Sequence, residues 1–292
     1  MHKTHHHAGL AAFSLLLLLM PGRLCAQSND FGIDLSAGAE KRLVGGRLTL
    51  GLDADFRTQD NTSRVERYDL ELSVSYKLID RKKYGLKAGL SYEHIWSQKL
   101  GECEATYKDK YYDDKFDYIG NGEFSPVLKG YNKGYNYTHA YWRQRSRVNG
   151  FVTFSYKPTK RWSFSLRETV QYNHYYSATA DRTKYREKVR YDEETTYTTE
   201  QTTKEKSSKD RFVLRSKFTV QYNIRRNPLA PFASVDFGTG LGYNVQKWKF
   251  SAGTDIKLNR QNALKVYYRF QTENDDDEPN GHLLGIGYNF KF

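Results

Sequence analysis

The side chains able to do acid–base chemistry in this chain are few and scattered. Asp53 and Asp55 form a carboxylate pair, but a protease that activates water also needs a histidine, and no Asp-x-His follows. A lipase or deacylase would need His-x-Ser on one strand, so that base and nucleophile share a face. No serine stands two positions after any histidine beyond the N-terminal region: His94, His139, His174 and His282. We therefore predict that the protein is not an enzyme.

Metal and nucleic-acid binding are also disfavoured. No His or Cys residues have the spacing of metal ligands, so we predict no cofactor. The formal net charge of +12 could indicate a nucleic-acid partner. However, the basic residues are spread over short turns and alternating positions rather than gathered in one patch. We therefore predict no nucleic-acid partner.

The N-terminal segment differs from the rest of the chain. Lys3 precedes an apolar run over Leu10–Met20, which is followed by Pro21, Gly22 and a small residue, Ala26. This order is typical of a secretory signal peptide, and the run is too short to cross a bilayer as a helix. We predict that residues 1–26 are removed by cleavage between Ala26 and Gln27, which leaves a single domain over residues 27–292.

Beyond residue 30 the sequence alternates between apolar and polar residues. In "RLTLGLDADFR", Leu48, Leu50 and Leu52 fall on one face and Asp53 and Asp55 on the other. Alternation of this length favours half-buried strands over helices. The same pattern occurs in these segments: 31–41, 67–78, 85–96, 145–156, 162–174, 211–224, 231–242, 248–258, 263–273 and 281–292.

Strand length and aromatic placement distinguish a membrane barrel from a soluble β-sandwich. The strands run to about 10–13 residues, which is enough to cross a bilayer when tilted. Aromatic residues gather at strand ends, as in the girdles of outer-membrane barrels. These residues are Trp96, Trp142, Tyr156, Trp162, Tyr172 and Trp248. We predict an all-β fold, a transmembrane antiparallel up-and-down β-barrel.

The number of strands and the loops follow from the same pattern. Eleven segments alternate, but single-chain bacterial barrels have even numbers of strands. We therefore predict about twelve strands, with ten as the alternative. Connections alternate between short and long, and the two longest, at about 97–143 and 176–210, are predicted to be external loops. Strands that extend beyond the membrane are the alternative, and they fit the partial alternation of "TKYREKVRYDEETTYTT".

The strand segments also carry a family resemblance. "AEKRLVGGRLTLGLDADFRTQDN", "RYDLELSVSYKLIDRKKYGLKAGLSYEH" and the closing "GIGYNFKF" resemble the domain-of-unknown-function family 2490. Its members are Gram-negative outer-membrane-like β-barrel proteins. The resemblance covers roughly residues 31–96 and 144–292, and it implies fold and location but no activity.

The polar face of the strands would line the barrel lumen, and its charges are distributed unevenly. Strands before residue 97 are mainly acidic and later strands mainly basic. The candidate lumen charges are Asp53, Asp55, Asp69 and Glu71 on the acidic side, and Arg145, Arg147, Arg167, Arg215 and Lys217 on the basic side. Two interpretations remain open: paired charges that fill and rigidify the interior, or an aqueous pathway with a transverse field.

One acidic residue departs from the alternation. Glu168 has the same parity as Leu166 and Val170, so a regular strand would point it into lipid. A bulge at Arg167–Glu168 that turns the side chain inward is one explanation, and protonation of the acid is another. A contact with a partner subunit is the functional alternative.

The chain ends on an aromatic residue. Tyr288, Phe290 and Phe292 alternate with Asn289 and Lys291 on the last predicted strand. We predict that these three aromatic residues form the signal that the barrel-insertion machinery reads.

Together these features predict a monomeric outer-membrane protein. Its partners would be outer-membrane lipid, the insertion machinery and an unidentified extracellular ligand. The function that we favour is a non-catalytic surface role, structural or ligand-interacting, through the long Tyr/Thr/Lys-rich loops. The alternative is a narrow channel for polar solutes with a charge-polarised lumen, and a barrel enzyme is the least favoured.

Overall fold

A computed structural model describes residues 30–190, 194–240, 245–273 and 281–292. Within these ranges the chain forms fifteen β-strands, and it contains no helix that could serve as a transmembrane span. The predicted signal peptide and its cleavage site between Ala26 and Gln27 lie outside the described residues.

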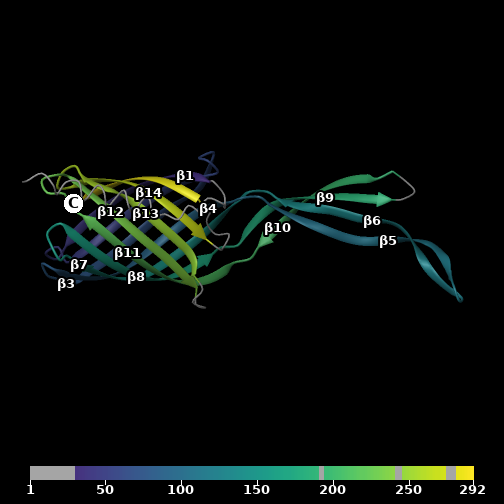
Figure 1. The fold of residues 1–292 in the computed structure, drawn as a ribbon, viewed down its shortest axis with the longest axis horizontal. Coiled ribbons are helices and arrows are strands. Elements are labelled where there is room, and N and C mark those ends of the chain that lie inside the picture. The colour runs from purple at the N-terminus through teal and green to yellow at the C-terminus, as the bar shows by residue number, and fades with distance from the viewer. Residues whose placement is uncertain (1–29, 191–193, 241–244, 274–280) are drawn as a thin grey trace, which may run out of the picture.

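Eleven of the strands close into a barrel (Figure 1). Around the wall the strand order is β1-β15-β14-β13-β12-β11-β8-β7-β4-β3-β2. The strands are β1 (Phe31–Leu43), β2 (Leu48–Gln59), β3 (Arg64–Asp80), β4 (Tyr84–Lys99), β7 (Tyr141–Tyr156), β8 (Trp162–Tyr175), β11 (Lys209–Tyr222), β12 (Leu229–Gly240), β13 (Val245–Lys257), β14 (Asn262–Glu273) and β15 (Gly281–Lys291).

The prediction of twelve strands, and its alternative of ten, is wrong. The eleven-stranded wall closes because β1 and β15 pair in parallel, from Phe31 opposite His282 to Glu40 opposite Lys291. A parallel ladder satisfies the backbone groups of both strands as fully as an antiparallel one, so an odd number can close. As a consequence, β1 begins at one end of the barrel and β15 finishes at the other.

The two predicted external loops are not loops where the structure describes them. They form a four-stranded sheet of β5 (Glu102–Gly120), β6 (Glu123–Thr138), β9 (Ala178–Arg190) and β10 (Thr196–Lys206), in the order β10-β9-β6-β5. This sheet, which we call the extension, projects from one end of the barrel (Figure 1). We call that end the extension end and the opposite end, with its short connections, the turn end.

The extension continues the barrel wall. Two residues separate each extension strand from a barrel strand, for example 100–101 between β4 and β5 and 207–208 between β10 and β11. Its order matches that of the four barrel strands that it continues, β11-β8-β7-β4. Four short junctions therefore connect the extension to the wall.

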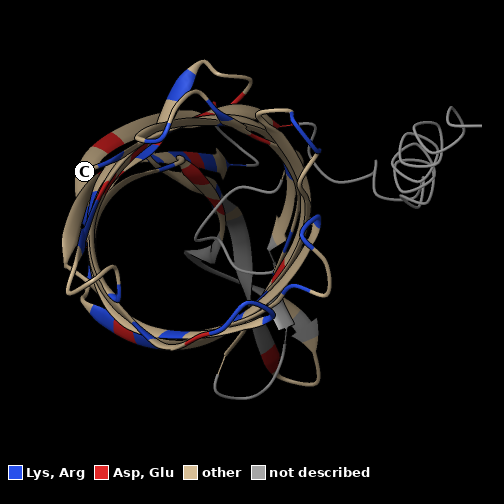
Figure 2. Cartoon of the chain, turned by 90° about the vertical axis from the view of Figure 1, so that its left-hand side faces the viewer, with Lys and Arg blue, Asp and Glu red and all other residues tan. Residues whose placement is uncertain are grey.

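The barrel buries its polar residues and exposes its apolar ones. Outward-facing Leu72 is 55% exposed and Val170 is 56% exposed, whereas inward-facing Asp34 is 2% exposed. Figure 2 looks along the barrel axis and shows charged positions around the ring of strands. This distribution is the reverse of that in a water-soluble sandwich, and it is the one expected for a wall in contact with lipid.

Aromatic rings lie at both ends of the outer face. At the extension end, Tyr68 stacks on Trp96 with ring centroids 5.1 Å apart. At the turn end, Tyr84 stacks on Tyr156 at 5.2 Å, and Trp162 lies 4.9 Å from Tyr222. The strand-end aromatics therefore form two belts on either side of the apolar band.

Candidate functional site

The lumen contains a network of charges centred on Asp34 of β1. Its carboxylate accepts hydrogen bonds from Arg57 at 3.1 Å, Arg269 at 3.1 Å and Tyr267 at 2.7 Å. Arg57 in turn lies 3.6 Å from Glu66. These residues come from both sides of the parallel β1–β15 closure, so the network connects the first strands to the last.

The Asp34 network depends on a glycine opposite Tyr267. Gly285 of β15 is the register partner of Tyr267 of β14, and a Cβ atom at Gly285 would lie 2.1 Å from the Tyr267 ring. The missing side chain lets the ring lie flat against the wall and its hydroxyl reach Asp34. The sequence pattern did not single out Tyr267. Its signal is an aromatic residue among the alternating polar positions that face the lumen.

Three further ion pairs fix charged side chains to the wall. Arg147 of β7 donates to Glu93 of β4 at 2.8 Å, and Arg67 lies 3.2 Å from Asp69 on the same strand, β3. Arg215 of β11 forms a bidentate pair with Asp236 of β12. Because most of these side chains are largely buried, the pairs are screened less than surface pairs.

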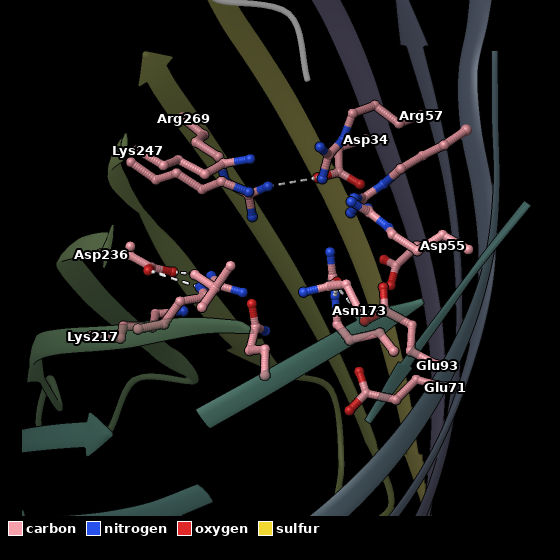
Figure 3. A pocket seen from close by; sticks show the side chains of 18 of the residues that line it. Asp34, Asp55, Arg57, Glu71, Glu93, Asn173, Lys217, Asp236, Lys247 and Arg269 are labelled. Carbon is pink, nitrogen blue, oxygen red and sulfur yellow. Dashed lines mark hydrogen bonds and ion pairs between the residues drawn. The ribbon is translucent and has the colours of Figure 1, made fainter. Parts of the chain in front are cut away.

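A cavity of about 240 Å³ remains between the charged walls. Asp55, Glu71 and Glu93 lie on one side of it (Figure 3). Lys217 and Lys247 lie on the opposite side (Figure 3). A second cavity of about 160 Å³ shares Glu71, Glu93 and Lys217 with the first. Both cavities therefore lie between side chains of opposite charge.

The structure brings most of the candidate lumen charges together. Those that line one or both cavities are Asp55, Glu71, Arg145, Arg147, Arg167, Arg215 and Lys217. Asp69 is buried beside Arg67. Asp53 lies next to Gly38 of β1 and lines neither of the two cavities.

Glu168 stays on the outer face of the barrel. Its strand, β8, pairs with β7 and β11 without a register shift, so the bulge considered at Arg167–Glu168 is not present. Its carboxylate accepts a hydrogen bond of 2.5 Å from Ser216 on β11. The interpretation that turned Glu168 inward is therefore wrong, because a regular strand keeps its parity.

A histidine and a serine meet across strands on the outer face. His94 of β4 and Ser146 of β7 are register partners, and the Nδ1 of His94 lies 3.2 Å from the hydroxyl of Ser146. The same hydroxyl also lies 3.0 Å from those of Tyr92 and Tyr176. These contacts belong to the aromatic belt on the outer face. They join two strands, so the absence of His-x-Ser within any one strand does not reveal them.

The C-terminal residues lie beside the barrel closure. The backbone N–H of Phe292 donates to the carbonyl of Glu40 at 2.8 Å, and the rings of Phe290 and Phe292 lie 4.6 Å apart. The hydroxyl of Tyr288 donates to Asn262 of β14. The predicted insertion signal therefore lies at the turn end, where β15 meets β1.

Ion pairs join the two edges of the extension near its base. Lys204 of β10 lies 2.5 Å from Glu104 of β5, and Lys206 lies 3.3 Å from Glu102. Arg182 of β9 also contacts Glu104, at 3.1 Å. Since β5 and β10 are opposite edges of the sheet, we call these contacts the edge latch.

The pKa of Glu104 reflects the edge latch. The hydrogen bond from Lys204 holds the pKa of Glu104 below its ordinary value, and Arg182 acts in the same direction. The Glu104 side chain is 45% exposed, so solvent screens these interactions.

No protein-family model matches the sequence, and no curated protein is detectably similar to it. Among solved structures, the chain is similar to the CymD monoaromatic hydrocarbon channel, with a TM-score of 0.34, 10% identity and coverage of 88% of this chain and 87% of that chain. It is also similar to the translocator domain of autotransporter NalP from Neisseria meningitidis, with a TM-score of 0.27, 9% identity and coverage of 91% and 90%.

At these low identities and TM-scores, the two solved structures support no function for this chain. The barrel is established by its own strand pairing, and the resemblance to the domain-of-unknown-function family 2490 stays a prediction.

Proposed function

We propose that the protein is an outer-membrane barrel that holds the extension rigidly at the cell surface for a non-catalytic, ligand- or partner-binding role. The observation that carries this proposal is the continuity of the extension with four neighbouring wall strands. A mobile loop loses conformational entropy when it binds, whereas a rigid sheet is already ordered. At about 3.3 Å per residue, the 19 residues of β5 reach about 60 Å.

The membrane location is supported by the apolar outer face and the two aromatic belts. In outer-membrane barrels the short turns face the periplasm and the longer segments face outward. We therefore place the extension outside the cell.

Protease treatment of intact cells tests this orientation. Asn121 and Gly122 form an exposed turn between β5 and β6, so added proteinase K is expected to cleave the extension there while the barrel stays intact. Membrane fractionation and heat-modifiable gel mobility check the location of the protein. Cleavage only after the outer membrane is opened would reverse the orientation, and release into the soluble periplasm would refute the proposal.

A narrow channel for polar solutes is the second candidate function. It is favoured by the two cavities that share residues within the lumen. Single-channel recording in planar bilayers tests it, because the absence of discrete openings would remove this candidate and leave the surface role unaffected.

A further inference from the structure

We propose that the lumen binds a small zwitterion, with its cationic end at Glu71 and its anionic end at Arg167 and Lys217. This proposal names the solute class for the second candidate function. It rests on that function only because the solute must be able to reach the lumen. All three residues line the cavity of about 160 Å³.

The other charges around this cavity are already paired. Arg215 is held by Asp236, and Glu93 is held by Arg147. Removing either partner of such a buried pair is costly, so these pairs act as fixed walls rather than as ligand-binding groups.

Arg167 and Lys217 differ from the paired cations. Among the described residues, neither has a carboxylate within 4.0 Å. Arg167 instead lies over the ring of Phe151, with its guanidinium carbon 3.9 Å from the centroid. That ring is fixed against Gly89 of β4, where a Cβ atom would lie 2.5 Å from the ring. The ring therefore holds the Arg167 guanidinium in position, and the N–H groups of Arg167 can still donate hydrogen bonds to a ligand.

Glu71 supplies the opposite charge. It belongs to β3, and two strands, β4 and β7, lie between β3 and β8, which carries Arg167. It is hydrogen-bonded to Ser91, and among the described residues no Lys or Arg lies within 4.0 Å of it. Glu71 and Lys217 also line the cavity of about 240 Å³, where they lie on opposite sides (Figure 3).

The unpaired charges of both signs determine the class of ligand. An anion alone would leave Glu71 without a partner, and a cation alone would leave Arg167 and Lys217 without one. A partly buried charge without a partner is costly, so a ligand with both charges is favoured over either single charge. Asn149, Thr169 and Gln171 also line the cavity and can hydrogen-bond to the ligand.

Three matched probes test the proposal on the full chain purified in detergent: 5-aminopentanoate, pentanoate and pentylammonium. They share a chain length and differ only in charge. By isothermal titration calorimetry, we expect 5-aminopentanoate to bind at least tenfold more tightly than either singly charged probe. Equal binding of pentanoate would show an anion site and overturn the proposal, as would no binding to a barrel that shows heat-modifiable mobility.

Two variants assign the ends of the ligand. Glu71→Gln is expected to lower the affinity for 5-aminopentanoate to that for pentanoate, and Lys217→Met to weaken the binding of both. Glu104→Gln, in the edge latch outside the barrel, is the matched control and should leave all three affinities unchanged. Binding is measured without conductance, so a barrel that conducts but shows no zwitterion preference would overturn this inference and leave the channel function standing.

Discussion

The extension continues four of the eleven barrel strands, yet the two regions place their side chains differently. In the barrel, charged residues point into the lumen and apolar residues face outward. In the extension, Tyr197 on one face of β10 is 76% exposed, and the charged latch residues on the other face are also in contact with solvent. The surrounding medium therefore decides the pattern, since lipid demands an apolar face and water does not.

Ion pairs in the two regions also differ in how much they contribute to the free energy of unfolding. The Asp34 side chain is 2% exposed and has three partners, whereas Glu104 in the edge latch is 45% exposed. A buried charge that loses its partner is strongly destabilising, and an exposed pair contributes little. The fold of the barrel should therefore depend on its ion pairs far more than that of the extension does.

The largest expected effect comes from Asp34. Asp34→Ala leaves Arg57 and Arg269 without their shared carboxylate and should lower the free energy of unfolding by about 3–5 kcal/mol. Urea unfolding in lipid vesicles, followed by heat-modifiable mobility, measures it. The matched change Glu104→Ala should cost less than about 1 kcal/mol. Equal costs in the two regions would contradict the distinction between them.

Removal of Phe292 should impair assembly. Its N–H bonds to Glu40 at the β1–β15 closure, and its ring packs on Phe290. We expect a several-fold lower fraction of heat-modifiable protein in the outer membrane. Replacing residues 103–137 of the extension by a short glycine-containing turn should leave that fraction unchanged. Normal assembly without Phe292 would show that it is not part of the insertion signal.

Glu168→Leu should stabilise the barrel. The change removes a carboxylate from the lipid-facing side of a regular strand, where a charge is costly, and it should raise the free energy of unfolding in vesicles by about 1–2 kcal/mol. Glu200→Leu, on an exposed extension strand in water, should give no such gain. A loss of stability, or weaker association between copies, would instead assign Glu168 to a partner contact.

The smallest effect is expected for the edge latch at low pH. Because the folded-state pKa of Glu104 is lowered, its contribution is complete above the ordinary pKa of 4.5 and is lost as pH falls through the lowered value. Hydrogen exchange of β10 should therefore show less protection at pH 3 than at pH 6. The groups that face Glu104 are Lys204 and Arg182, with Lys206 and Glu102 nearby.

Glu104→Gln is the control for this pH dependence. It should reduce the change in protection between the two pH values. Equal protection of β10 at pH 3 and pH 6 in the unaltered chain would show that the latch does not hold the edges together.

Period-two alternation was enough to predict the barrel and the polar lumen, because each parity corresponds to one face of a strand. The alternation also gave eleven segments. We nevertheless predicted about twelve strands, because single-chain bacterial barrels have even numbers of strands. The parallel pairing of β1 with β15 depends on which strands meet in space, and no local pattern encodes it.

The extension was predicted as two long external loops, with strands extended beyond the membrane as the alternative. The weak alternation in "KYREKVR" of β9 and "TYTTE" of β10 belongs to strand segments that are at least partly exposed on both faces, so neither face has to be apolar. Its sheet order is decided by the barrel strands that it continues.

The sequence alone therefore determined which residues face lipid and which face the lumen, since that choice is local and repeats every second residue. Only the tertiary structure decided which lumen charges are paired. Arg215 meets Asp236 on the neighbouring strand, whereas Arg167, Lys217 and Glu71 come from three strands that the barrel brings around one cavity. Such contacts depend on closure and register, which are properties of the whole wall rather than of any segment.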